Sequence, residues 1–126
     1  MTEVHRASTQ QEWRAAINST PEDGVIHINL DGIHVPRISL PSTVGLVLTG
    51  EGHIGTITDN THVVSLSGNL RVDDVHGFTH IDRVDGPAHI GYVFMGAVVR
   101  NVDPKAHIGW VGGNAEVTYI DGSRYE

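Results

Sequence analysis

The amino-acid sequence predicts an all-β fold, a parallel β-helix or solenoid built from nine-residue units. From Gly52 to Ser123 the chain divides without a gap into eight such units, each with an aliphatic residue at its third and sixth positions. Fifteen of these sixteen residues are β-branched, which favours strands over helices. Self-similarity at a fixed short period is typical of solenoids, in which each unit buries its apolar side by stacking on its neighbours.

The units pair into coils. Nine residues are too few to close a coil around a packed interior, so we infer two nonapeptide units, about 18 residues, per coil. The fourth position supports this doubling, because odd units carry Gly55, Asp73, Gly91 and Gly109 there, whereas even units carry Val64, Asp82, Arg100 and Thr118. The segments "GHIGTI", "AHIGYV" and "AHIGWV" begin units one, five and seven. We therefore expect them on one side of the solenoid, in one column.

Residues 8–20 predict a short capping helix. Ser8 or Thr9 offers an N-cap, with Gln11 or Glu12 three residues later, which is a common start of helices. Pro21 follows as a stop. One face of this helix is apolar and would cover the open end of the first coil: Trp13, Ala16 and Ile17.

Residues 24–51 alternate apolar and polar residues between turn signals, which predicts irregular first coils of the same solenoid. With the helix at 8–20 and the eight repeats at 52–123, residues 1–126 form a single β-solenoid domain. This length buries a core without disulfides, and the chain has no cysteine.

The stretch from Ser8 to Gly52, a capping helix followed by a glycine turn and short strands, resembles the start of right-handed parallel β-helix proteins of the pectate-lyase-like group. We infer a right-handed coil from the general preference for right-handed crossovers between parallel strands. The lyases of that group build their sites on long loops, with clustered Asp for calcium and an Arg base. The strict spacing over residues 52–123 leaves no such loops, so we expect no enzymatic activity and no cofactor.

Charge and hydropathy exclude two classes of partner. The formal net charge is −7, and seven of the eight cationic residues are Arg. Such a balance argues against nucleic-acid binding, which needs a basic face. No apolar run is long enough to span a bilayer, and the first residues lack the apolar stretch of a signal peptide. We therefore expect no membrane contact and synthesis in the cytoplasm.

Histidine recurs at the second position of five units: His53, His62, His80, His89 and His107. These side chains should point outward, because they flank the buried third position. Parallel rungs lie about 4.8 Å apart, so His89 should neighbour His107 and His62 should neighbour His80. Such a pair could hold a transition metal, or the residues are polar surface residues. We assign no metal, because no third ligand recurs beside either pair.

Aspartate recurs at the seventh position of the last three even units: Asp85, Asp103 and Asp121. Like charges on adjacent rungs cost energy unless they are compensated. This column could bind a cation such as calcium, or each Asp caps its own turn. Turn capping is the interpretation we favour.

Two aromatic residues, Tyr92 and Trp110, occupy the fifth position in consecutive odd units. Exposed aromatic ladders suit sugar rings or a protein partner, and a corner aromatic that seals the core is the alternative. After Ser123 only three residues remain, too few to cap a terminal coil. We therefore expect a second copy, in a homo-oligomer for which a trimer is favoured, or another protein to cover a partner surface of Tyr92, Trp110, Tyr119, Arg124 and Tyr125.

Together these features favour a non-enzymatic structural or assembly protein. Small solenoids of this kind are familiar in bacteriophage particles, so the leading hypothesis is a virion component, such as a capsid-decoration or tail-associated module. One alternative is a polysaccharide-binding or polysaccharide-degrading β-helix, in which Tyr92, Trp110 and the Asp column form a groove. The other is an acidic decoy that occupies a host nucleic-acid-binding or defence protein.

Overall fold

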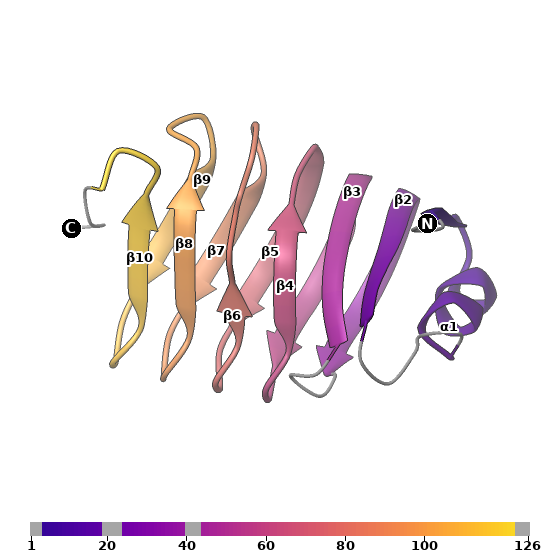
Figure 1. Ribbon diagram of the computed structural model, residues 1–126, viewed down its shortest axis with the longest axis horizontal. Coiled ribbons are helices and arrows are strands. Elements are labelled where there is room, and N and C mark those ends of the chain that lie inside the picture. Colours follow the sequence, from indigo (N-terminus) through magenta and orange to yellow (C-terminus); the bar gives the residue numbers. More distant parts are fainter. Residues whose placement is uncertain (1–3, 19–23, 40–43, 123–126) are drawn as a thin grey trace.

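The computed structural model is a parallel β-solenoid of about five turns, with one short helix at its N-terminal end (Figure 1). The structure describes residues 4–18, 24–39 and 44–122. Within them lie helix α1 (Gln10–Asn18) and ten strands: β1 (Val4–Ala7), β2 (Gly24–Ser39), β3 (Val44–Thr58), β4 (His62–Leu66), β5 (Asn69–Val75), β6 (His80–Ile81), β7 (His89–Val93), β8 (Val98–Val102), β9 (His107–Val111) and β10 (Glu116–Tyr119).

Each coil contributes one strand to each of two faces (Figure 1). The even-strand face consists of the first halves of β2 and β3 followed by β4, β6, β8 and β10. The odd-strand face consists of the second halves of β2 and β3 followed by β5, β7 and β9. The long strands β2 and β3 run around the corner between the faces, so the sheet is continuous in the order β10-β8-β6-β4-β3-β5-β7-β9.

The register confirms two nine-residue units per coil. Val72 pairs with Ile90, and Ile90 pairs with Ile108, so partners are eighteen residues apart. The first coil is less regular, because Gly24 pairs with Val44 twenty residues later and the register shifts between Asp31 and Ile33. From β5 onward the odd-strand face keeps the spacing of eighteen.

The core lies between the two faces and contains the third residue of every unit and the sixth residue of the first six units, whereas Val111 is partly buried and Ile120, the sixth residue of the last unit, is 52% exposed. On the odd-strand face Ile54, Val72 and Ile90 are fully buried one above another, and Val63, Ile81 and Val99 form the matching row opposite. Two fully buried threonines, Thr61 and Thr79, sit at the corners of this core. The hydroxyls of Thr61 and Thr79 donate to the carbonyls of Thr58 and His76, both at 2.8 Å, so neither hydroxyl is left without a partner.

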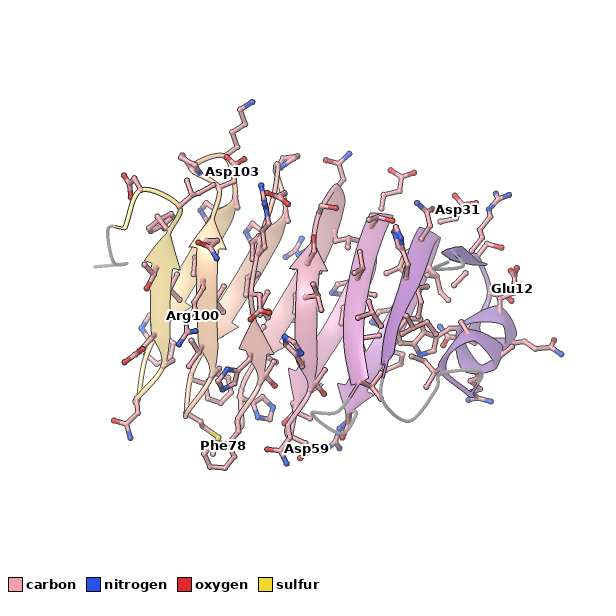
Figure 2. The ribbon with its side chains drawn as sticks, viewed as in Figure 1. Glu12, Asp31, Asp59, Phe78, Arg100 and Asp103 are labelled. Atoms are coloured by element: carbon pink, nitrogen blue, oxygen red, sulfur yellow. The ribbon has the colours of Figure 1, made fainter. Side chains whose placement is uncertain are left out.

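One corner of the coil repeatedly uses the left-handed backbone conformation. Asp59, Gly77, Met95 and Gly113 succeed one another there with φ of 63°, 72°, 61° and 62°. Met95 is the unusual member, because a long side chain disfavours this conformation. Figure 2 shows Asp59 and Phe78 along this edge of the solenoid and Asp103 along the opposite edge.

Helix α1 covers the first coil, as predicted, and begins with a capping box. The Thr9 hydroxyl accepts a bond from the Glu12 N–H at 3.1 Å, and the Glu12 carboxylate accepts the Ser8 hydroxyl at 2.6 Å. The bonds from Ser8 lower the pKa of Glu12. Trp13 and Ala16 are buried, and the helix contacts β1 and β2. Pro21, the expected stop, lies outside the described residues.

Strand β1 was not predicted. It pairs in parallel with β2, from Val4 opposite His27 to Ala7 opposite Leu30, and so adds one more rung to the even-strand face. Among the described residues α1 is the one helix, and it is neither long nor apolar enough to cross a membrane.

Candidate functional site

The odd-strand face presents three outward columns, formed by the second, fourth and fifth residues of the odd units. The second-position column runs through five rungs in register: His34, His53, Arg71, His89 and His107. The rings of His34 and His53 stack with their centroids 4.6 Å apart, and those of His89 and His107 do the same. Arg71 separates the two imidazole pairs, so the column is not purely histidine.

The fourth-position column forms a depression in the surface where it carries glycine, because no side chain fills the space. A Cβ on Gly91 would lie 2.7 Å from the carbonyl oxygen of Asp73, and one on Gly109 would lie 2.5 Å from that of Gly91. A side chain at either position would therefore push two rungs apart. The result is a depression of about 570 Å³, which we call the glycine channel, lined by Arg71, His89, Gly91, Tyr92, Gly109 and Trp110.

Two aromatic rings form one wall of the glycine channel. Tyr92 and Trp110 are paired in register on β7 and β9, and they are 54% and 51% exposed. Their rings meet edge to face, with centroids 6.1 Å apart. Because half of each ring is in solvent, neither residue is sealed into a corner of the core. This wall offers apolar surface for binding.

Charged groups cluster at the end of the channel nearest the N-terminus. Asp73 Oδ2 lies 2.8 Å from His53 Nε2, and Asp73 Oδ1 lies 3.8 Å from Arg71 Nε. Asp74 pairs in register with Tyr92, in the same column as the aromatic rings. Burial, together with the positive charges of His107 and Arg71, lowers the pKa of His89 against the opposing effect of Asp73. Near neutral pH the His89 imidazole in the channel wall is thus uncharged.

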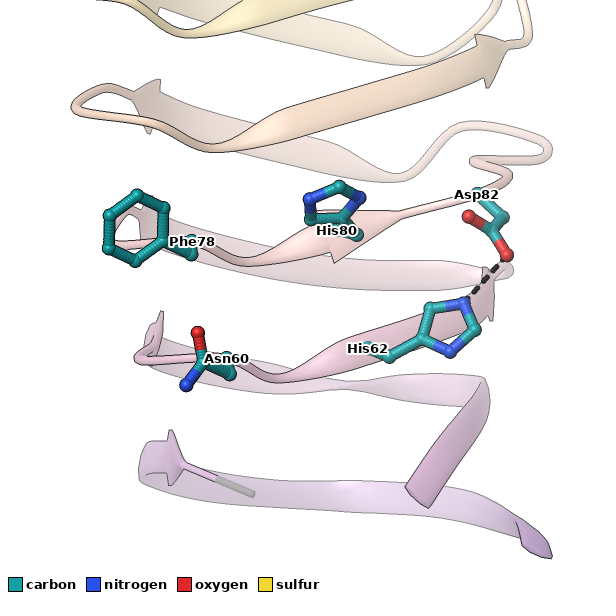
Figure 3. Close-up of a pocket in the computed structure, with 5 residues that line it drawn as sticks. All are labelled: Asn60, His62, Phe78, His80 and Asp82. Atoms are coloured by element: carbon teal, nitrogen blue, oxygen red, sulfur yellow. Dashed lines mark hydrogen bonds and ion pairs between the residues drawn. The ribbon is translucent and has the colours of Figure 1, made fainter. Parts of the chain in front are cut away.

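A second depression lies on the even-strand face. It has a volume of about 330 Å³ and is lined by Asn60, His62, Phe78, His80 and Asp82. Figure 3 shows the side chains of His62 and Asp82 pointing toward one another, with Nε2 and Oδ2 2.7 Å apart. Phe78, 70% exposed, stands at the other end of the depression.

The two histidine–aspartate contacts lie at equivalent positions, but the one between His62 and Asp82 is a hydrogen bond, whereas His53 Nε2 lies 2.8 Å from Asp73 Oδ2 without hydrogen-bond geometry. His53 to Asp73 and His62 to Asp82 each join the second position of one unit to the fourth position of the unit one coil later. One contact lies on each face, between the same two coils. We interpret them as clamps between rungs, because each brings together partly exposed side chains from two neighbouring coils.

Two members of the predicted Asp column, Asp85 and Asp103, have separate partners within the chain. Asp85 pairs with Arg83 at 2.8 Å, whereas the Asp103 carboxylate accepts the Lys105 N–H at 2.9 Å, as expected of a turn cap. Asp121 is exposed after β10. None of the three lines the glycine channel, so Arg71 and His89 take the place that the sequence analysis gave to the Asp column. Among the described residues no group of three His, Asp or Glu could hold a metal ion.

The predicted partner surface is split by the fold. Tyr92 and Trp110 lie together on the odd-strand face, whereas Tyr119 is half-buried in β10 on the other face and packs against the core. Arg124 and Tyr125 lie outside the described residues. Sequence reasoning missed Arg71, although its second position in unit three places it in the histidine column. It also missed the channel, which depends on how closely the glycines at the fourth position approach the neighbouring rung.

Comparison of the chain with known protein families, with curated proteins and with solved structures finds no match. The class of protein is therefore defined by its own geometry, which is that of a parallel β-solenoid. A function has to be inferred from the residues of the two faces.

Proposed function

We propose that this solenoid is a non-enzymatic assembly module that docks through its odd-strand face. The observation that carries the proposal is the half-exposed pair Tyr92 and Trp110 beside the glycine channel. Aromatic residues are enriched in protein interfaces, and each ring has few rotatable bonds to immobilise on binding. Large rings held half in solvent on a regular face are therefore well suited to contact a partner.

The frame behind the face favours the same function. Tyr92 and Trp110 are held by β7 and β9, whose buried neighbours Ile90 and Ile108 stack in register. Sites built on regular strands keep their geometry better than sites built on loops. Little conformational entropy is lost when such a face binds, which favours association.

The finer proposal is that the module belongs to a bacteriophage particle, as a capsid-decoration or tail-associated component. It is supported by the small size of the solenoid and by its regular nine-residue repeats. It is an analogy at the level of the fold.

Glycan binding is the second candidate. The glycine channel combines exposed rings with planar hydrogen-bonding groups, the Arg71 guanidinium and the His89 imidazole, which suit the faces and hydroxyls of sugars. An array of neutral and acidic glycans, probed with the wild-type chain and with Trp110→Ser, tests this candidate.

The assembly proposal is tested by the mass of the chain in solution. Light scattering coupled to size exclusion, at chain concentrations from about 1 to 100 μM, should give a mass above the 13.6 kDa of one chain, or a stable complex with the product of a neighbouring gene. The variant in which both Tyr92 and Trp110 are replaced with Ser should have the mass of one chain and form no complex. A monomer under all these conditions, with no complex, would overturn the proposal.

A further inference from the structure

We infer that the odd-strand face pairs with the same face of a second copy, about a two-fold axis parallel to the solenoid axis. This inference rests on the proposed function and names the partner. In a two-fold symmetric contact both copies use the same patch, so a residue at one position of the patch contacts a residue at a second position on the other copy, and the reverse contact forms as well. The residues at the two positions must therefore be complementary. The second and fifth positions of the odd units meet this requirement.

The charges of the middle rung are self-complementary. Strand β5 carries Arg71 at the second position and Asp74 at the fifth, on the same outward side. A two-fold axis parallel to the solenoid axis places the second position of one copy opposite the fifth position of the other. Each rung lies opposite the same rung of the other copy. Arg71 of each copy then lies opposite Asp74 of the other, so the contact gains two ion pairs.

The next two rungs match ring against ring. The same exchange places His89 opposite Tyr92 and His107 opposite Trp110. Imidazole and aromatic rings pack well across such a contact, and the lowered pKa of His89 keeps its ring uncharged near neutral pH. The glycine channel between the two columns gives the exposed rings of the other copy room to enter.

Two other charged groups on the face have neighbours within the chain. The Asp73 carboxylate, near the centre of the face, contacts both His53 and Arg71. Arg37, on the first rung, lies 3.5 Å from Asp59. Asp73 therefore shares Arg71 with Asp74 of the other copy, whereas Arg37 keeps its partner within its own chain.

The area of the face sets the strength of the contact. Five rungs about 4.8 Å apart, with strands of about five residues at about 3.3 Å each, give a footprint of roughly 24 by 17 Å, or about 400 Å² per copy before surface relief is counted. Stable interfaces bury about 800 Å² per partner, so this contact belongs to the small, reversible class. We expect a dimer that dissociates in the micromolar range, and not the trimer expected from the sequence.

A charge swap distinguishes this arrangement from others. Arg71→Glu alone and Asp74→Arg alone each set like charges against one another across the two-fold axis. Each should weaken dimerisation at least about tenfold in sedimentation equilibrium. The double variant Arg71→Glu/Asp74→Arg restores opposite charges and should return to within about threefold of the wild-type dissociation constant. Far-UV circular dichroism checks that each variant is folded.

A matched control uses an exposed aromatic residue away from this face. Phe78→Ser, on the corner, should leave dimerisation unchanged, whereas Trp110→Ser should weaken it about tenfold or more. A dimer that survives both single charge variants, or that the swap does not restore, would overturn the inference and leave the assembly proposal standing. A wild-type chain that is monomeric at about 100 μM and binds only a glycan or no partner would overturn both.

Discussion

Ile90 offers a direct test of the stacking that holds the coils together. Its side chain is fully buried and lies between Val72 on one rung and Ile108 on the next. Ile90→Ala removes three carbon atoms, which at about 0.8 kcal/mol each is a transfer loss of about 2.4 kcal/mol. The neighbouring rungs are held by backbone hydrogen bonds and cannot close the gap, so the cavity raises the loss to about 3–4 kcal/mol.

Urea unfolding followed by far-UV circular dichroism at 25 °C measures this loss. The midpoint should fall while the slope stays the same, and Ile90→Val should cost about 1 kcal/mol. Ile120→Ala is the matched control, because Ile120 is 52% exposed and should lose under about 1 kcal/mol. If Ile90→Ala cost no more than Ile120→Ala, Ile90 would not lie between packed rungs, and the column would be wrongly placed.

Three further predictions concern single residues. Burial and the charges of His107 and Arg71 lower the pKa of His89 in the folded chain. As the pH drops below about 6.5, His89 is therefore protonated more readily in the unfolded chain than in the folded chain, and the free energy of unfolding falls. The difference in unfolding free energy between wild type and His89→Asn, measured from about pH 7.5 to 5.5, should show this loss. Met95→Asn should raise the free energy of unfolding by up to about 1 kcal/mol, because Asn tolerates the left-handed conformation of Met95. Thr79→Val should lower it by about 1–3 kcal/mol, because the carbonyl of residue 76 loses its buried donor.

Each of these predictions has a contradicting outcome in the same urea titrations. A His89→Asn difference that does not change with pH would show that this imidazole binds protons equally in both states. A loss of stability in Met95→Asn would mean that the Met95 side chain packs well enough to offset its backbone strain. If Thr79→Val were neutral, the hydroxyl would contribute nothing beyond filling space.

The nine-residue period was sufficient to predict the core, apart from Ile120 in the last unit, which is exposed. Ile90 and Ile108 recur at the same position of units one coil apart, and in a parallel solenoid equal positions stack. The capping helix was also predictable, since Thr9 and Glu12 interact locally. Both inferences depend on contacts that are near in sequence or repeated at a fixed spacing.

The features of the structure that the sequence did not predict depend on contacts that are neither near in sequence nor repeated at a fixed spacing. Strand β1 has only four residues, and its pairing with β2 depends on the space left beside the first coil. The clamps from His53 to Asp73 and from His62 to Asp82 span twenty residues, one coil plus a diagonal step. The channel depends on how closely Gly109 approaches the carbonyl of Gly91, which no residue pattern measures.

The constant spacing of eighteen residues along the odd-strand face also bears on how such a chain can vary in length. Duplicating or deleting one coil, for example residues 88–105, would lengthen or shorten the rod by about 4.8 Å and keep every column continuous. A duplication of nine residues would instead exchange the faces of everything that follows it, and would turn Trp110 toward the side of His80. Relatives of this protein should therefore differ by whole coils and not by half coils.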